Sequence, residues 1–405
     1  MPDPSSTLPL ELVQKIFGHY LKDRKYPVQS FDFSDGLWVL GQVSSAWRSA
    51  SLSSKSLWST IEITIKHPSS KKPGIIADDI MVLMNLAPLS DACPNPEVRA
   101  VSSHAANQVL AEILHRSGDL PLDIFLSFPI PSAVNPTSPT WSRLFTLLLV
   151  ESSRWRSFVL AAPDVIWESF SEVSPSHCPL LRDIDAFCEG GFSSIPILRT
   201  CTNVKKLSIH SLKRSSSISE STVIHMPFLQ DLEVGGVDML NVITAPNIST
   251  LRLTGSAYPQ ALPNTSVPDF LHRSRCSLVA LDLTFCTNID LIDILSNIQS
   301  LHSFSVSVFF GEELSGLLVK MKSDSSFLPK LQELNLSIDQ FRTGVESNCY
   351  AELILDVVES RIAGGALKSV TVEPMNVEMK KISKSRLDAL NALPNVNIKL
   401  MDGLI

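Results

Sequence analysis

Glycine, aromatic residues and paired metal ligands are scarce in this chain of 405 residues, and each shortage excludes a class of site. The sequence has 16 glycines but no G-x-x-x-x-G-K-[ST] or G-x-G-x-x-G segment, so no glycine-rich phosphate loop is indicated. It also lacks the G-x-S-x-G segment of many hydrolases. The seven cysteines include no C-x-x-C pair and the nine histidines no H-x-x-x-H pair. We therefore expect no enzymatic activity, no cofactor and no bound metal.

Charge and hydropathy exclude further classes of protein. The formal net charge of -7 disfavours a nucleic-acid partner, because such proteins carry clustered lysine and arginine. The longest apolar segment, 144–150, is far shorter than the ~20 residues of a membrane-spanning helix, so we expect no membrane association. The chain begins without a basic segment followed by an apolar one, so we expect no secretory signal. These features predict a cytoplasmic and/or nuclear protein with reduced thiols.

The first 65 residues predict two helices and a strand. In 8–21 the apolar residues follow helical spacing, and Pro9 suits a first helical turn. The polar segment 22–36 predicts a loop. Apolar residues then recur at intervals of three and four, which predicts one continuous helix over 37–50. Alternating isoleucines in 59–65 predict a strand.

From residue 58 onward a short pattern recurs, in which three apolar residues are separated by two free positions and then by one. Segments with helical periodicity lie between several of the copies, at 105–117, 267–274, 290–298, 312–321 and 350–362. Alternation of one short strand with one helix indicates a leucine-rich-repeat solenoid within the α/β class. The nine copies are Trp58-Ile61-Ile63, Trp155-Phe158-Leu160, Val204-Leu207-Ile209, Leu229-Leu232-Val234, Ile248-Leu251-Leu253, Leu278-Leu281-Leu283, Leu301-Phe304-Val306, Leu331-Leu334-Leu336 and Leu367-Val370-Val372.

The best copy is LVALDLTFC at 278–286, which fits L-x-x-L-x-L-x-x-[N/C] throughout. In this pattern Cys286 has a structural role, satisfying backbone groups at the turn after the strand. The spacing of the copies is irregular, which predicts degenerate repeats with loop insertions. The alternative is an ordinary α/β sheet with helices on both faces, and such a sheet needs a crossover helix after each strand. The segment 234–250 is too short for one, so the repeat hypothesis is favoured.

The segment 8–58 resembles an F-box, the module that docks onto the adaptor Skp1. Its LPLELVQKIF is similar to the family's opening L-P-x-E-[IL]-x-x-x-I-[FL]. Its VSSAWRSASLSSKSLW is similar to the closing half, V-[CS]-x-x-W-R followed by L-W. The loop between the halves is longer than in the compact form, and in this respect the chain resembles the F-box proteins of mushroom-forming fungi (basidiomycetes). Their later segments are echoed at 116–127, 151–160 and 283–306.

The resemblance implies the substrate-recognition subunit of a Skp1–cullin–F-box ubiquitin ligase. Such a subunit binds Skp1, and through it a cullin, and accelerates ubiquitin transfer by holding its substrate nearby. The alternative is a repeat scaffold or binding protein that is not engaged with a cullin ligase, in which 8–58 only caps the array. The residues that the resemblance assigns to Skp1 binding are Leu8, Pro9, Leu12, Ile16, Phe17, Val43, Trp47 and Trp58.

The predicted organisation is a helical F-box domain at 1–60 with its core at 8–58, a connecting region at 61–180 and the repeat solenoid at 181–405. A protein substrate is expected on outward positions of the repeat strands, because alternate side chains point away from the core. A plain solvated surface explains any one of these positions equally well. The outward positions are Lys206, Ser208, His210, Asp231, Glu233, Thr250, Arg252, Asp282, Thr284, Glu333 and Asn335.

Overall fold

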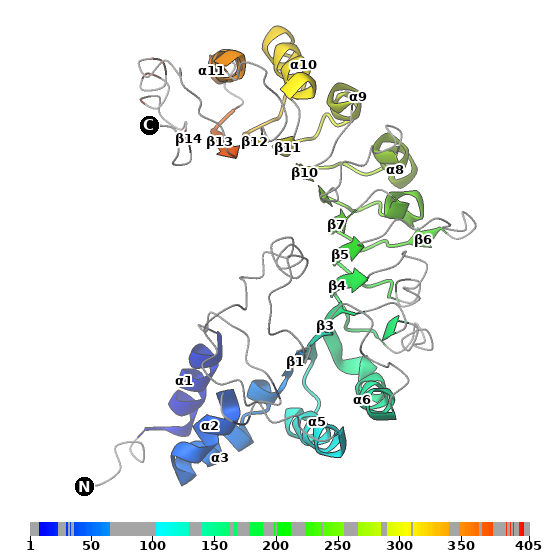
Figure 1. Cartoon of the computed structure of the whole chain (residues 1–405), viewed down its shortest axis with the longest axis vertical. Coiled ribbons are helices and arrows are strands. Elements are labelled where there is room, and N and C mark those ends of the chain that lie inside the picture. Colours follow the sequence, from blue (N-terminus) through cyan, green and yellow to red (C-terminus); the bar gives the residue numbers. More distant parts are fainter. Residues whose placement is uncertain are drawn as a thin grey trace, which may run out of the picture. The chain divides into compact units, whose positions relative to one another are not determined.

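The computed structural model is a mixed α/β structure whose strands run parallel (Figure 1). The chain divides into two compact units, 1–189 with 194–201 and 190–193 with 202–405. The strand at 183–188 belongs to the first unit. The described residues are 8–22, 30, 33, 36–64, 103–128, 139–162, 166–167, 178–188, 198, 201–211, 223–235, 238–254, 266–284, 290–308, 311–339, 348–363, 367–375, 386, 389, 392 and 397–400.

The first unit begins with three helices, α1 (Leu10–Lys22), α2 (Gly36–Val43) and α3 (Ser45–Ser53), followed by the 3-10 turn η2 (Lys55–Trp58). The prediction of one continuous helix over 37–50 is wrong, because the chain breaks at Ser44. Its backbone is extended (φ -155°, ψ 168°), and its hydroxyl accepts the N–H of Trp47 at 3.2 Å. This is the geometry of an N-cap residue, which begins a new helix.

Four strands complete the first unit and pair in chain order. They are β1 (Thr60–Thr64), β2 (Leu122–Ser127), β3 (Trp155–Ala161) and β4 (Asp183–Cys188). Helix α5 (Ser103–Ser117) precedes β2, and α6 (Pro139–Val150) with the 3-10 turn η3 (Ser152–Arg154) precedes β3. The strand expected at 59–65 and the helix expected at 105–117 are therefore confirmed.

In the described part of the second unit, eight parallel strands also pair in chain order. They are β5 (Lys206–Ser211), β7 (Asp231–Gly235), β9 (Thr250–Thr254), β10 (Ala280–Thr284), β11 (Ser303–Val308), β12 (Glu333–Asp339), β13 (Ser369–Met375) and β14 (Asn397–Leu400). Two shorter strands, β6 (Ile224–His225) and β8 (Ile243–Thr244), pair with each other.

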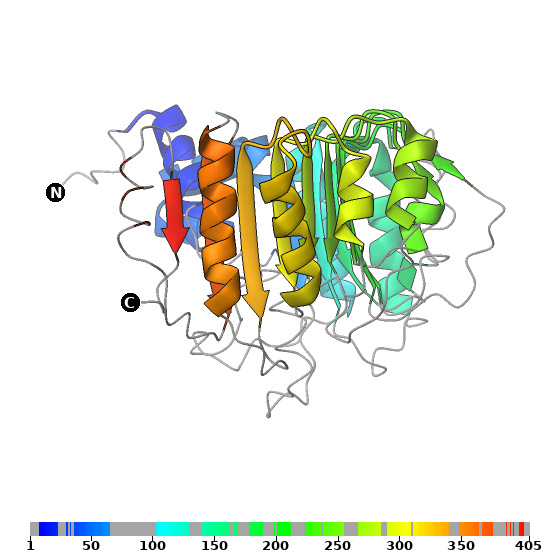
Figure 2. The same ribbon diagram turned by 90° about the horizontal axis from the view of Figure 1, so that it is seen from above.

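The helices of the second unit lie side by side on one face of these strands, as Figure 2 shows for α8–α11. They are α8 (Ser266–Ser274), α9 (Leu291–Ser296), α10 (Gly311–Ser323) and α11 (Asn348–Ala363), with a 3-10 turn η7 (Asp238–Asn241) before β8. The four helices expected in this part of the sequence are confirmed.

Buried apolar residues join the strands to the helices. All three residues of each of the nine repeated copies are buried, and none is more than 4% exposed. The residues between them alternate to the other face, as the burial patterns of β7, β9 and β10 show. Cys286, which was expected to stabilise a turn, lies outside the described residues.

A repeated backbone contact sets the register of the strands in the second unit. From β5 to β12, the carbonyl of the residue just before each strand of this order accepts two N–H groups from the start of the next strand. For example, the Lys205 carbonyl accepts from Gln230 at 2.8 Å and from Asp231 at 3.0 Å. The carbonyls of Gln230, Ser249, Val279, His302 and Gln332 do the same toward the strand that follows each.

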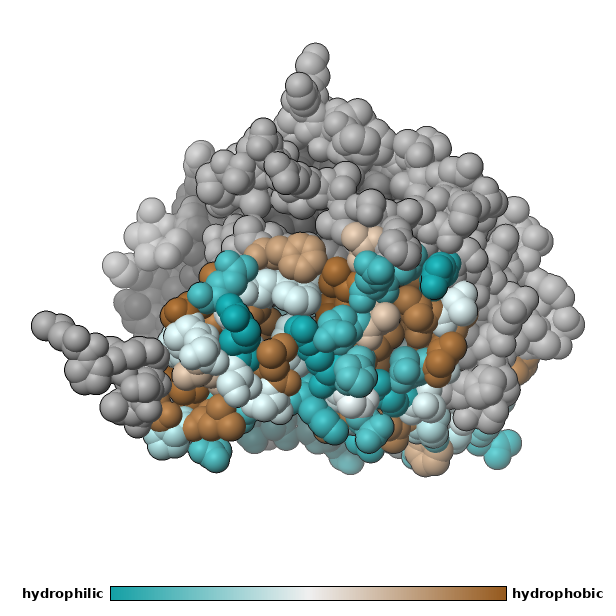
Figure 3. All heavy atoms as spheres, turned by 90° about the horizontal axis from the view of Figure 1, so that it is seen from below, coloured by the Kyte–Doolittle hydropathy of each residue, from teal (hydrophilic) through white to brown (hydrophobic). Residues whose placement is uncertain are grey.

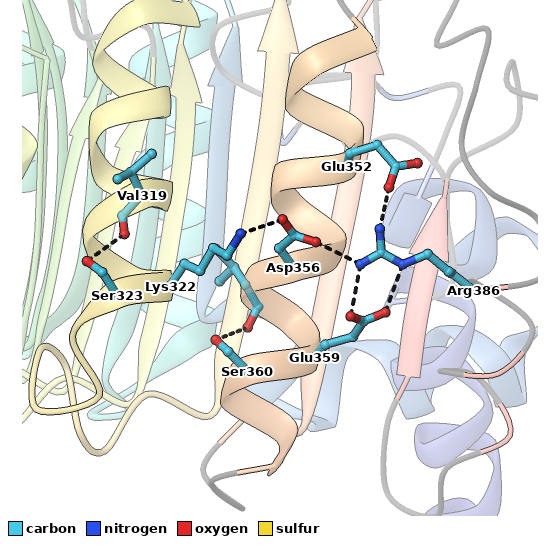
Figure 4. A network of polar contacts seen from close by, with 9 residues as sticks. Val319, Lys322, Ser323, Glu352, Asp356, Glu359, Ser360 and Arg386 are labelled. Carbon is cyan, nitrogen blue, oxygen red and sulfur yellow. Dashed lines mark hydrogen bonds and ion pairs between the residues drawn. The ribbon is translucent and has the colours of Figure 1, made fainter.

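Two arginine side chains connect α11 to neighbouring segments through hydrogen bonds and ion pairs. Arg361, 7% exposed, donates to the carbonyls of Met321 and Asp324 at 2.9 Å each, at the carboxyl end of α10, where the helix dipole favours a cation. Arg386 binds three carboxylates of α11 (Figure 4). These belong to Glu352, Asp356 and Glu359, and Lys322 of α10 also binds Asp356 at 2.7 Å. Hydrogen bonds from Lys322 and Arg386 hold the pKa of Asp356 below its usual range.

Neighbouring residues of β11 provide a test of this two-faced arrangement. Phe304 is fully buried, whereas Ser305 lies on the opposite face. We expect Phe304→Ala to lower the free energy of unfolding by about 3–5 kcal/mol, because it leaves a cavity between strand and helices. Ser305→Ala should change it by less than about 0.5 kcal/mol. Urea denaturation followed by circular dichroism measures both, and equal effects would contradict the assigned faces.

Candidate functional site

Helices α1–α3 pack around a small apolar core. Val13 and Phe17 of α1 meet Leu40 of α2 and Ala50 of α3, with Trp47 packed against them. The rings of Phe17 and Trp47 are edge to face at 5.1 Å. A core of this size leaves a module of about fifty residues with much apolar surface uncovered.

A second apolar stripe on α1 and the turn before it points away from this core. Leu8, Leu12, Ile16 and Tyr20 follow one another at intervals of four, and their exposed fractions are 44%, 46%, 48% and 42%. Val43, at the end of α2, is 57% exposed. Figure 3 looks onto the helices of the first unit and shows hydrophobic residues exposed among polar ones. Exposed apolar side chains in a row are typical of a surface that another protein covers.

The residues that the resemblance assigns to Skp1 binding fall into two groups. Leu8, Pro9, Leu12, Ile16 and Val43 are exposed. The other three pack inside the module: Phe17 is fully buried, Trp58 is 3% exposed and Trp47 is half-buried. Sequence reasoning missed Leu10 and Tyr20, which are 44% and 42% exposed, although the spacing of Tyr20 from Ile16 was a usable signal.

An arginine–tryptophan cluster joins α1–α3 to the strands of the first unit. The guanidinium of Arg116, from α5, lies 4.5 Å from the ring centre of Trp58 and 5.4 Å from that of Trp38. Trp58 donates its indole N–H to the carbonyl of Ser51 at 2.7 Å, a buried hydrogen bond. A cation over two indole faces is stabilising, and more so where water is excluded.

The edge strand β1 carries a buried carboxyl group. Glu62 is 7% exposed, and burial raises its pKa from 4.5 to about 7. Its carbonyl accepts the N–H of Ser30 at 2.8 Å, and its N–H donates to the Ser30 hydroxyl at 2.9 Å. Trp38 in turn donates to the Ser30 carbonyl at 3.0 Å, which ties this loop residue to both α2 and β1.

The outward residues predicted for substrate binding come together on one face of the second unit. The parallel register aligns them in three rows that run across the strands. Row one contains Lys206, Asp231, Thr250, Ala280, Ser303, Glu333 and Ser369, and row two contains Ser208, Glu233, Arg252, Asp282, Ser305, Asn335 and Thr371. His210 and Thr284 lie in row three with Ser307 and Ser337.

Three polar contacts orient side chains on this face. The Thr284 hydroxyl donates to Oδ1 of Asp282 at 3.0 Å. Around His210, the Ser208 hydroxyl lies 2.8 Å and a Glu233 carboxylate oxygen 3.7 Å from the same ring nitrogen, Nε2. In a serine–histidine–acid relay the serine and the carboxylate contact different ring nitrogens. The three residues therefore do not form such a relay in this arrangement.

Searches of known proteins and of metal or membrane features add little to this geometry. The sequence matches no protein-family model and no curated protein. In the described parts of the chain, no group of three or more His, Cys, Asp or Glu is placed to hold a metal. Of the helices that the structure describes, none has both the length and the apolar character to cross a membrane.

The arginine–tryptophan cluster can be tested by removing only its charge. Arg116→Met keeps the aliphatic stem, and we expect it to lower the free energy of unfolding by about 1 kcal/mol through loss of the cation–π contacts and of the exposed ion pair with Glu112 at 2.8 Å. The matched control is Arg143→Met on the exposed side of α6, which should cost less than about 0.5 kcal/mol. Thermal and urea denaturation measure both variants, and equal values would rule out a special role for Arg116.

Burial of Glu62 predicts a pH-dependent stability. The folded state binds this proton more tightly than the unfolded state, so the free energy of unfolding falls as pH rises from 4.5 to about 7. Glutamine does not titrate, and the advantage of Glu62→Gln should therefore grow from pH 5 to pH 8 by about 1–3 kcal/mol. Urea denaturation across this range, with Glu333→Gln at an exposed strand position as the control, measures it. An advantage that stays constant with pH would contradict the shift.

Proposed function

We propose that this chain is an F-box protein, the substrate-recognition subunit of a Skp1–cullin–F-box ubiquitin ligase. In this proposal α1–α3 bind a Skp1-like adaptor, and through it a cullin, in the cytoplasm and/or nucleus. The strand and helix units form a degenerate leucine-rich-repeat-like solenoid that holds a protein substrate. The chain itself has no catalytic role, and it needs no metal or cofactor.

The exposed stripe of α1 is the observation that carries the proposal. Val13 and Phe17 already satisfy the internal packing of α1, so Leu12 and Ile16 are not needed to hold α1 against α3. Full burial of an exposed apolar side chain of this size contributes about 1.5–3 kcal/mol, and Leu8, Leu12 and Ile16, which are 44–48% exposed, can gain about half of that each. A partner that covers the stripe therefore gains several such contributions, as when an amphipathic helix fills an apolar groove. The motif residues Leu8, Leu12 and Ile16 that resemble an F-box are the residues on this stripe.

The parallel strands support the repeat part of the proposal. In each unit, strand follows strand in chain order, and each repeated copy buries the same three positions. Structural units that contact only their neighbours in this way are typical of solenoid proteins, which present long surfaces for binding. The arginine–tryptophan cluster around Arg116 supports a positioning role, because it packs the adaptor-binding helices against α5 and its neighbours.

Co-purification with a Skp1-type adaptor tests the proposal. We expect the wild-type chain, expressed with the adaptor, to retain it through size-exclusion chromatography. Leu12→Asp with Ile16→Asp should lose it, because both positions are exposed and the carboxylates would be desolvated at the interface. Circular dichroism should show that the doubly substituted chain is still folded, since neither side chain belongs to the core.

A matched control separates this surface from general effects of a new charge. Val150, at the end of α6, is 73% exposed and apolar, and Val150→Asp should leave adaptor binding unchanged. If the wild-type chain fails to retain the adaptor, or if the doubly substituted chain retains it equally well, the proposal is wrong. A complex that contains the adaptor but recruits no cullin would instead favour the scaffold hypothesis.

A further inference from the structure

In two of its rows, the outward face of β5–β13 carries carboxylates in a periodic arrangement. In rows one and two of β5–β13, carboxylates occur on every second strand, β7, β10 and β12. They belong to Asp231 and Glu233, to Asp282 and to Glu333. The strands between carry Thr250 and Arg252 on β9 and only serines on β11. Four carboxylates against the cations of Lys206 and Arg252 leave rows one and two of β5–β13 net negative.

Within the described residues, this face has no helix of the second unit packed on it. Helices α8–α11 lie on the opposite face (Figures 1 and 2), where the repeated apolar residues are buried. The outward positions of rows one and two are instead Ser, Thr, Ala, Asn or charged residues, and nearly all are half-buried or exposed. The outward side chains of β10 and β11 are short and project little from the sheet. An elongated partner can therefore lie across the strands.

The spacing of the carboxylates matches one backbone conformation closely. Neighbouring strands lie about 4.8 Å apart, so strands two steps apart are separated by roughly 9.6 Å. A polyproline II helix advances about 3.1 Å per residue with three residues per turn, so every third side chain returns to one face at about 9.3 Å. Rows one and two are about 7 Å apart along a strand, a distance that a flexible lysine side chain bridges. A fully extended strand does not match, because its third side chain points to the opposite side.

We infer that this face binds a basic polyproline II segment with lysine or arginine at every third position. The cations of the segment meet the carboxylates of β7, β10 and β12 in turn. Arg252, on β9, makes no hydrogen bond or ion pair in the part of the chain that the structure describes, and it opposes segments whose cations fall between these strands. The inference rests on the proposed function only in naming this segment as part of the substrate.

Peptide binding to the full chain tests the spacing. The probe is a fluorescein-labelled peptide of four Lys-Pro-Pro units, and its comparison is a block isomer with the same composition and all lysines at one end. In fluorescence anisotropy at low ionic strength, we expect the repeating peptide to bind about fivefold more tightly than the block isomer. Equal affinities would overturn the inference, because general attraction would then suffice, and so would failure of both peptides to bind.

Charge substitutions on the face test the site itself. Glu233→Gln, Asp282→Asn and Glu333→Gln together should weaken the repeating peptide roughly tenfold, the sum of three partly exposed ion pairs. Arg252→Gln should act in the opposite direction and tighten it about twofold. Unchanged affinity in the triply substituted chain, or weaker binding after Arg252→Gln, would overturn the inference.

The control substitutions remove the same charge elsewhere. Glu11→Gln, Asp269→Asn and Asp293→Asn lie on exposed helical positions and should change the affinity less than about twofold. A tenfold loss here would mean that net charge alone controls binding, and would overturn the inference. The chain with Leu12→Asp and Ile16→Asp should keep its peptide affinity. A wild-type chain that fails to retain the adaptor but binds the repeating peptide as expected thus contradicts only the proposed function. A wild-type chain that retains the adaptor but does not prefer the repeating peptide contradicts only this inference.

Discussion

The shared carbonyl at the start of each strand is the constraint on which the second unit depends. One oxygen accepts two N–H groups from the next strand, as at Lys205 and Ser249, and so fixes where that strand begins. A slip of one residue would move every apolar side chain to the open face and every polar one into the core. Because the same contact recurs from strand to strand, loops of different length between the copies do not disturb the alignment. The rows of outward side chains are a direct consequence of this contact.

The two surfaces proposed for binding have opposite chemistry, and each follows from how its element is packed. Helix α1 buries Val13 and Phe17 against α2 and α3 and leaves Leu12 and Ile16 uncovered, because the apolar residues of α1 extend beyond the side that these two helices cover. The strands of the second unit instead bury every apolar residue of the repeated copies against the helices, so their open face is polar. Apolar surface on α1 and charge on the sheet therefore arise from the same requirement, burial of apolar area.

Much of this fold was predictable from sequence because each repeated copy combines two signals, a strand period and a fixed offset to the preceding apolar residue. Strands β2 and β4 escaped the pattern for identifiable reasons. Asp119 stands where β2 would need its first apolar residue, and Ala186 is the third apolar residue of β4. The break at Ser44 was missed because the helical spacing of apolar residues continues across it. The break is marked by the N-cap hydrogen bond of Ser44, a local polar contact that this spacing does not reveal. Within the candidate site, the sequence motif identified Leu12, which is exposed, but it could not distinguish Leu12 from Phe17, which is buried. Both are apolar residues of one motif, and only the position of α3 distinguishes them.

The difference in chemistry between the two surfaces implies different binding behaviour. Apolar contacts of the kind offered by Leu12, Ile16 and Val43 are insensitive to salt and dissociate slowly once water is excluded. Half-exposed carboxylates such as Asp282 and Glu233 are screened within about 8 Å at physiological ionic strength, and they favour fast association and fast exchange. The proposed function, in which the chain stays with its adaptor while successive substrates arrive and leave, would need this division. The chain supplies it by keeping apolar side chains on α1 and charges on the sheet, with the cation of Arg116 packed on the tryptophans that join α1–α3 to the first strands.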